Sequence, residues 1–280
     1  MGVLDQIVRD KRDEVLRRKR EISRSELEAR GKTLPPPRDF RAVLLPKPLP
    51  GLWPGARGLG PRARRVGLIA EIKKGSPSRG VFAGSFDPVA LARTYSANGA
   101  SALSVLTDEK YFHGRLEHLE AVRAAVDLPI LRKDFVLDEY QLWEARALDA
   151  DAVLLIVAAL EPPQLRDLVQ AAKGIGLSSL VEVHTTRELD AALALDLSVV
   201  GINNRNLQTL ETRLETSLEL IPRIPPGPVV VSESGLFTRD DVERVVEAGA
   251  HAVLVGEALV TAADVAAKVR ELALLEDIRP

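Results

Sequence analysis

From residue 66 onwards, short apolar runs alternate with amphipathic stretches of helical spacing. Eight such runs occur, at residues 66–72, 102–107, 129–135, 152–157, 178–183, 199–204, 229–234 and 252–257. Helical patterns lie between them, for example at 87–100, 138–150 and 238–250, and a last one follows at 262–275. Continuous hydrophobic strands joined by helices indicate a parallel sheet that is covered on its faces. Eight strand–helix units within residues 66–275 predict a closed (β/α)8 barrel.

The alternative architecture is an open, doubly wound sheet. That fold usually needs fewer units, and its first strand leads into a Gly-x-Gly-x-x-Gly turn, which follows none of the eight runs. We therefore expect one barrel domain over residues 66–280. Residues 1–65 are expected to form an N-terminal extension, in which helical spacing over the first 30 residues ends at Gly31 and a run of prolines. Residues 41–65 are rich in proline, glycine and arginine and are expected to be a linker.

Composition argues against several classes of function. The 38 basic and 40 acidic residues leave a net charge of −2, so nothing attracts the chain as a whole to nucleic acid or to an anionic membrane. The absence of cysteine removes disulfides, zinc–thiolate sites, iron–sulfur clusters and thiol catalysis. The charged N-terminus lacks the apolar stretch of a signal peptide, and the longest apolar run, 152–160, is too short to span a bilayer. We expect a cytoplasmic monomer or weak homodimer with no nucleic-acid or membrane partner.

Polar residues end five of the eight strands, where a barrel of this kind carries its chemistry. Because side chains alternate along a strand, Glu71 and Lys73 should enter the barrel mouth, whereas Lys74 should point away. The other strand-end residues expected in the mouth are Lys133, Glu182, Asn203 followed by Arg205, and Ser232 with Ser234. Lysines and glutamates this close together would shift one another's pKa values, which suits acid–base catalysis.

Small residues follow the last two strands, in Ser-Glu-Ser-Gly at 232–235 and Val-Gly-Glu-Ala at 255–258. Such residues let backbone amides approach a bound anion, and these two loops commonly hold phosphate in barrels. We therefore expect a phosphorylated small-molecule substrate near Gly235 and Gly256, with Lys73 supplying charge. The four histidines are scattered without a His-x-x-x-His pair, so no metal site is expected. His184 follows Glu182 on the same face and is expected to support the site or the core.

Eight motifs carry a family resemblance, in the order IAEIKKGSPSRG, LSVLTDEKYFHG, ILRKDFVLDEYQ, DAVLLIV, LVEVH, GINNRNL, SESGL and VLVGEAL. Together they closely resemble the indole-3-glycerol phosphate synthases, densely over residues 66–260 and more loosely over the N-terminal helix. The resemblance implies ring closure of 1-(2-carboxyphenylamino)-1-deoxyribulose 5-phosphate in tryptophan biosynthesis, with loss of carbon dioxide and water. It also implies that no cofactor or metal is required.

The resemblance implies a role for each strand-end residue. Lys133 matches the general acid, and Glu182 matches the residue opposite it that works as a base or cation stabiliser. Lys73 matches a lysine that contacts the substrate carboxylate or shares in proton transfer. Glu71 would orient the lysines, and Asn203 would hold a substrate hydroxyl. The remaining implied contacts are with the anthranilate carboxylate (Arg205), the phosphate (Ser76, Ser234, Gly235 and Gly256) and the aromatic ring (Phe112, Leu154, Ile156 and Leu207).

Two features depart from the family pattern. Gly75 stands where the family often has alanine, and residues 47–65 look longer and richer in proline, glycine and arginine than expected. Other barrel functions fit less well. A phosphoribosylanthranilate isomerase would ordinarily use a cysteine base, and a metal-dependent epimerase would need clustered histidines at the strand ends. A barrel kept only for binding or assembly would not need Lys133 and Glu182.

Overall fold

The computed structural model describes residues 2–48, 64–76, 80–82 and 86–275. It confirms the closed barrel, whose eight parallel strands follow the order β10-β11-β12-β3-β6-β7-β8-β9. The strands are β3 (Gly67–Ile72), β6 (Ala102–Leu106), β7 (Ile130–Lys133), β8 (Ala152–Ile156), β9 (Ser178–Val183), β10 (Val199–Asn203), β11 (Val229–Glu233) and β12 (Ala252–Val255). Each lies within, or within one residue of, an apolar run of the sequence.

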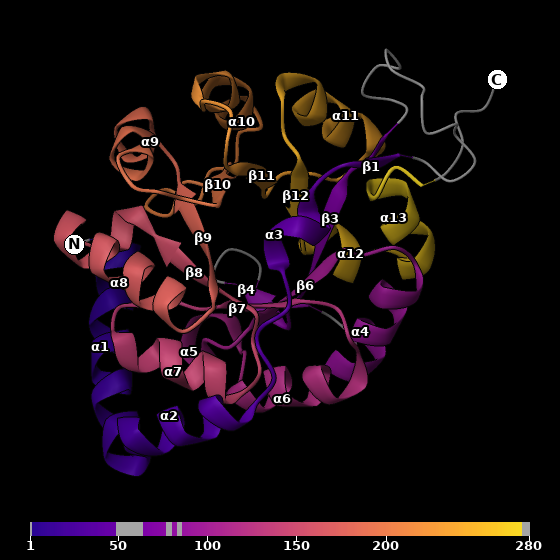
Figure 1. Cartoon of the computed structure of the whole chain (residues 1–280). Coiled ribbons are helices and arrows are strands. Elements are labelled where there is room, and N and C mark those ends of the chain that lie inside the picture. Colours follow the sequence, from indigo (N-terminus) through magenta and orange to yellow (C-terminus); the bar gives the residue numbers. More distant parts are fainter. Residues whose placement is uncertain (1, 49–63, 77–79, 83–85, 276–280) are drawn as a thin grey trace.

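Helices surround the barrel and connect its strands (Figure 1). They are α4 (Pro88–Ala97), α6 (Leu116–Ala125), α7 (Glu139–Ala147), α8 (Pro162–Gly174), α9 (Thr186–Leu193), α10 (Glu215–Leu220), α11 (Arg239–Ala248) and α13 (Val265–Leu272). Two short helices, α5 (Glu109–Phe112) and α12 (Glu257–Val260), were not expected from the sequence. Side chains of Asp87, Asp108 and Asp138 accept hydrogen bonds from first-turn amides of α4, α5 and α7. These caps set where each helix begins after its strand.

Side-chain alternation divides the apolar core into two layers. The inner layer fills the barrel and includes Ile69, Leu131, Leu180 and Val231. The outer layer lies between the strands and the helices. Because residues i and i+2 share a face, the inner layer decides which strand-end side chains enter the mouth. Among the described residues, no helix is both long enough and apolar enough to cross a bilayer.

The N-terminal extension differs in detail from the expected single helical run. It breaks into α1 (Val3–Glu21) and α2 (Arg24–Thr33) at Ser23, whose side chain accepts a hydrogen bond from the amide of Glu26. Gly31 lies inside α2 rather than at its end. A short helix, α3 (Phe40–Leu44), reaches into the predicted linker, and the linker's ends pair as β1 (Lys47–Pro48) and β2 (Arg64–Arg65). Residues 49–63, the rest of the predicted linker, lie outside the described residues.

The extension packs against both ends of the barrel. Fully buried Phe40 and Leu44 of α3 join the inner layer, and the backbone of Leu44 contacts Gly67 at the start of β3. Leu4 and Ile7 of α1 join the same layer and line the cavity at the carboxyl ends of the strands. The apolar residues of the extension therefore complete the barrel interior, with α3 at the amino ends of the strands and α1 at their carboxyl ends.

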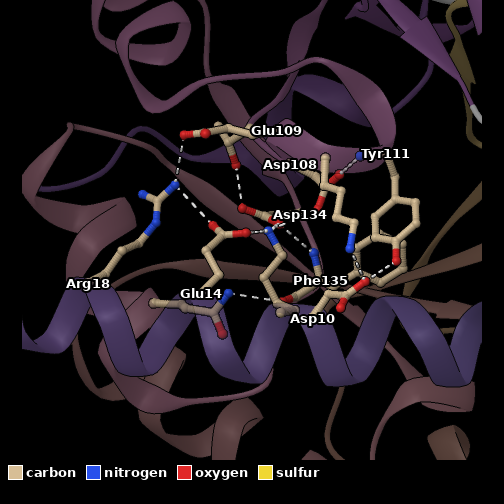
Figure 2. A network of polar contacts seen from close by, with 12 residues as sticks. Asp10, Glu14, Arg18, Asp108, Glu109, Tyr111, Asp134 and Phe135 are labelled. Carbon is tan, nitrogen blue, oxygen red and sulfur yellow. Dashed lines mark hydrogen bonds and ion pairs between the residues drawn. The ribbon is translucent and has the colours of Figure 1, made fainter.

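A closed ring of six alternating charges fastens α1 to the barrel. It runs through Lys11, Asp134, Arg132, Glu144, Arg18 and Glu14, and each carboxylate uses its two oxygens for two different cations at 2.6–3.1 Å. Figure 2 shows Glu14 and Arg18 projecting from α1 toward Asp134 and Glu109. Lys11 and Arg132 are each only 1% exposed, and buried charges are tolerated when they are fully paired. Since Asp134 directly follows Lys133, the ring anchors α1 beside the third barrel strand, β7.

Candidate active site

A cavity opens where the barrel strands end. Of the residues expected in the site, all but Ser232 line it: Glu71, Lys73, Ser76, Phe112, Lys133, Leu154, Ile156, Glu182, Asn203, Arg205, Leu207, Ser234, Gly235 and Gly256. They come from all eight strands or from the loops after them. The exposed Lys74 does not line the cavity, as its position on the strand predicted.

Lys133 lies at the centre of the polar part of the cavity. Its Nζ is 3.2 Å from Oε2 of Glu182 and 2.5 Å from Oε2 of Glu233, and both carboxylates are buried. Burial opposes the charge of Lys133, but Glu233, Glu182 and Glu71 outweigh it and raise the pKa of the ammonium above its usual range. Lys133 is therefore a protonated donor held between two carboxylates.

The two carboxylates beside Lys133 differ in their proton affinity. Burial favours the neutral acid in both. For Glu182, Lys133 and His184 outweigh burial and lower the pKa below its ordinary value. For Glu233, burial and the nearby Glu182 carboxylate prevail over Lys133 and raise the pKa to about 7. Divergent pKa values in neighbouring carboxylates are typical of sites that divide acid and base roles.

Glu233 was missed by sequence reasoning, and the inward orientation predicted for Ser232 was wrong. Val229 and Val231 of β11 belong to the inner layer, so Glu233 shares their face. Ser232 instead points outward, with its Oγ 2.7 Å from the Oγ of Ser217. The run of valines at 229–231 is apolar on both faces, so periodicity could not choose between them. The charge of Glu233 at a strand end was the signal available.

Glycines make room for the charged groups. A methyl group at Gly201 on β10 would overlap the Glu233 carboxylate. A methyl group at Gly256 would overlap the Glu71 carboxylate and lie 3.0 Å from Nζ of Lys73. Glu71 and Lys73 form an ion pair of 2.9 Å beside that glycine. The carboxylates of Glu233 and Glu71 are thus packed against the backbone of Gly201 and Gly256 rather than against side chains.

Asn203 and Arg205 continue the polar wall after β10. Oδ1 of Asn203 accepts a hydrogen bond of 2.9 Å from the backbone amide of Arg205. The Arg205 guanidinium lies 3.3 Å from the Glu257 carboxylate, which directly follows Gly256. Arg205 is therefore held toward the β12 side of the cavity.

The turn after β11 forms a rim of small residues. Ser234 and Gly235 have successive positive φ angles of 66° and 74°, a conformation that favours glycine at the second position. The side-chain amide of Asn204 donates a 2.9 Å hydrogen bond to the carbonyl of Ser234 and fixes the turn. Ser76, after β3, is buried and lines the same cavity. Residues 77–79 and 83–85 of the first loop lie outside the described residues.

Apolar side chains line the other part of the cavity. Phe112 packs against Phe135 with ring centroids 6.2 Å apart. The expected Leu154, Ile156 and Leu207 contribute to the same cluster, and so do Leu4 and Ile7 from α1. Sequence reasoning did not assign α1 to this wall. Its apolar spacing showed a buried face, but not which surface covered that face.

The described residues contain no group of three or more histidine, aspartate or glutamate side chains placed to hold a metal ion. A family model described as indole-3-glycerol phosphate synthase matches residues 4–272.

The chain belongs to the indole-3-glycerol phosphate synthase family.

Curated relatives support the same assignment over nearly the whole chain. An indole-3-glycerol phosphate synthase from Roseiflexus sp. (strain RS-1) is 49% identical over 96% of this chain and 97% of its own length. One from Chloroherpeton thalassium is 45% identical over 95% of this chain and 98% of its own. One from Bordetella pertussis is 54% identical over 71% of this chain and 76% of its own.

Solved structures with low sequence identity share the fold alone. A 3-hexulose-6-phosphate synthase from Salmonella typhimurium aligns with a TM-score of 0.61 at 13% identity, over 75% of this chain and 98% of its own. A thiamine phosphate pyrophosphorylase from Pyrococcus furiosus aligns with a TM-score of 0.56 at 18% identity, over 74% of this chain and 95% of its own.

Membership of the indole-3-glycerol phosphate synthase family confirms the activity expected from the motifs, that of a carboxy-lyase of tryptophan biosynthesis.

Proposed function

We propose that the chain closes the ring of 1-(2-carboxyphenylamino)-1-deoxyribulose 5-phosphate to give indole-3-glycerol phosphate, with Lys133 as general acid and Glu182 as base or cation stabiliser. One observation carries the assignment of these roles. An ammonium group lies between two buried carboxylates of different proton affinity, inside a cavity with one apolar and one polar wall.

The two walls suit the two ends of the substrate. Phe112, Leu154, Ile156 and Leu207, together with α1, offer an apolar surface to the aromatic ring. Ser76, Ser234, Gly235 and Gly256 offer small side chains and backbone amides to the phosphate. The ribulose chain then extends between them and brings its carbonyl carbon to Lys133.

Acid catalysis starts the reaction. Lys133 donates a proton to the ribulose carbonyl oxygen while the ring carbon that bears the carboxylate attacks the carbonyl carbon. The carboxylate then leaves as carbon dioxide, and the electron pair of its bond restores the aromatic ring. The new hydroxyl group takes a second proton from Lys133, once Glu233 has reprotonated it, and leaves as water. Glu182 stabilises the resulting cation and accepts the proton that is lost as the ring double bond forms. Glu233, with its pKa near 7, can return a proton to Lys133.

The other polar residues orient these groups. The Glu71–Lys73 pair lies where the substrate carboxylate or phosphate can contact Lys73. Asn203 would hold a substrate hydroxyl, and Arg205 is assigned to the anthranilate carboxylate. Arg205 also pairs with Glu257, next to Gly256 of the expected phosphate loop, so the phosphate is an alternative ligand of Arg205.

We further propose that the extension (1–65) and the barrel (66–280) work as one unit, in a cytoplasmic monomer or weak homodimer. Described residues of both parts line the cavity. Light scattering of the purified protein over a range of concentrations measures this state directly.

The direct test is product formation by the purified chain. Incubation with the substrate should develop the absorbance and fluorescence of an indole, together with one equivalent of carbon dioxide. Folded protein that gives neither signal would instead be a barrel kept for binding or assembly, and the proposed function would be rejected.

A further inference from the structure

His184 lies between two carboxylates directly after β9. Its Nδ1 is 3.0 Å from Oε2 of Glu188 on α9, and its Nε2 is 3.3 Å from Oε1 of Glu182 in the active site. The side chain is 7% exposed and does not line the substrate cavity. It therefore reaches the reaction only through Glu182.

Each ring nitrogen of His184 faces a carboxylate oxygen. Glu188 also accepts from the backbone amide of His184 at 2.8 Å and from the hydroxyl of Thr185 at 3.1 Å, which fixes the carboxylate on the Nδ1 side. On the other side, Nε2 of His184 and Oε1 of Glu182 are both buried, and neither forms a hydrogen bond of good geometry in the described part of the chain. They lie 3.3 Å apart, at ion-pair distance. A ring whose two nitrogens each face a carboxylate is stabilised in its charged imidazolium form.

This contact distinguishes the two carboxylates around Lys133. Lys133 contacts both Glu182 and Glu233 and lies nearer to Glu233, so its charge alone does not direct the proton to Glu233. Of these two carboxylates, His184 contacts only that of Glu182. We propose that His184 is a positioning residue, whose imidazolium orients Glu182 and directs the proton of the carboxylate pair to Glu233. The inference rests on the proposed function, because it assigns His184 a part in that reaction.

The surrounding charges agree with this role. Burial opposes the imidazolium, but the carboxylates of Glu182 and Glu188 raise the pKa of His184 to about 9. The ring is thus charged at neutral pH. The other ionisable groups that face this region are Glu71, Lys133 and Glu233 on the barrel side and Glu211, Arg213 and Glu219 in the surface hollow beside His184.

The wild-type protein allows a first test that needs no variant. We expect the ring nitrogens of His184, followed by NMR, to show the doubly protonated form at pH 7.5 and to titrate near pH 9. His118 and His251 are internal controls, because burial lowers their pKa values and leaves them neutral at this pH. A neutral His184 ring at pH 7.5 would overturn the inference.

Kinetics test the role itself. In His184→Gln, loss of the cation lets Glu182 take up a proton more readily. The acidic limb of the plot of kcat/KM against pH should therefore move to higher pH by about one unit or more. On that limb the variant should lose about tenfold in kcat, with KM nearly unchanged because His184 lies outside the cavity. His184→Lys restores a cation and should move the limb back toward that of the wild type.

The matched control is His251→Gln at the opposite end of the barrel, where the ring accepts a hydrogen bond from the amide of Val230. Its acidic limb should coincide with that of the wild type. An unshifted acidic limb in His184→Gln would refute the positioning role while product formation by the wild type still stood. A wild type that forms no product would reject the proposed function instead, whatever the NMR titration shows.

Discussion

At the scale of single residues, the space for the Glu233 carboxylate in the candidate active site depends on a missing side chain. Gly201 faces into the barrel, and the carboxylate of Glu233 occupies the volume that a methyl group there would need. Gly201, which has no functional side chain, therefore helps to set the position of the Glu233 carboxylate beside Lys133.

Gly201→Ala should therefore displace Glu233 and lower kcat/KM about 100-fold, since a shift of about 1 Å in a catalytic group has that effect. Gly174→Ala, at the end of α8, is the matched control because a methyl group there meets nothing within 4 Å. It should keep full activity and stabilise the fold by about 0.5 kcal/mol. Steady-state kinetics and thermal melting of both variants check the pair. Equal activity in the two would contradict the steric argument.

Residue-level reasoning from the sequence succeeded where one strand face was plainly polar. Glu71, Lys133 and Glu182 each follow an apolar residue two positions earlier, so alternation placed them in the mouth correctly. It failed for Glu233, because Val229 to Val231 carry no periodic signal. Pairing of β11 with β10, which aligns Val231 with Gly201, settles the orientation, and pairing between strands cannot be read from one strand's sequence.

At the scale of elements, α1 belongs to the active site as much as to the extension. Its apolar end covers the aromatic wall, and its charged middle closes the ion-pair ring through Lys11 and Asp134. The sequence predicted the helix but not this contact, because the ring joins residues more than 100 positions apart. Only the folded chain brings the strand end of β7 to α1.

Lys11→Met should uncouple α1 from the barrel. Breaking a buried ion pair leaves unpaired carboxylates, so we expect the free energy of unfolding to fall by about 3 kcal/mol and KM to rise as the aromatic wall loosens. Lys19→Met removes an exposed α1 ion pair with Asp138 and should cost less than about 1 kcal/mol. Urea unfolding and steady-state kinetics check both variants. Similar losses of stability in the two would contradict a special role for the ring.

The pH dependence of this difference follows from the ring's charges. Burial opposes the charges of Lys11 and Asp134, but their partners prevail, so the pKa of Lys11 is raised and that of Asp134 is lowered. The stabilisation from Asp134 is present above its ordinary pKa and is lost only as the pH falls well below it. That from Lys11 is present below its ordinary pKa and is lost only in strong base. The gap between wild type and Lys11→Met should therefore stay constant between about pH 5 and pH 9.

At the scale of the whole molecule, the barrel could be predicted because both faces of each strand are buried. That burial makes each strand a continuous apolar run. Eight such runs alternating with helices predict a closed barrel, which the structure has. The expected site followed from the architecture, since all its residues lie at the strand ends. The packing of α1 and α3 against the two barrel ends did not follow, because their apolar faces could pack against many surfaces.

The central claim is that Lys133 is the acid of a ring-closing carboxy-lyase, and Lys133→Ala tests it most directly. Indole fluorescence should show that turnover falls ~100- to 10,000-fold. Folding should survive, because Glu233, with its pKa near 7, can take up a proton once the ammonium is gone. Lys74→Ala, at the exposed lysine of the β3 loop, should turn over like the wild type. Near-normal turnover by folded Lys133→Ala would contradict the account.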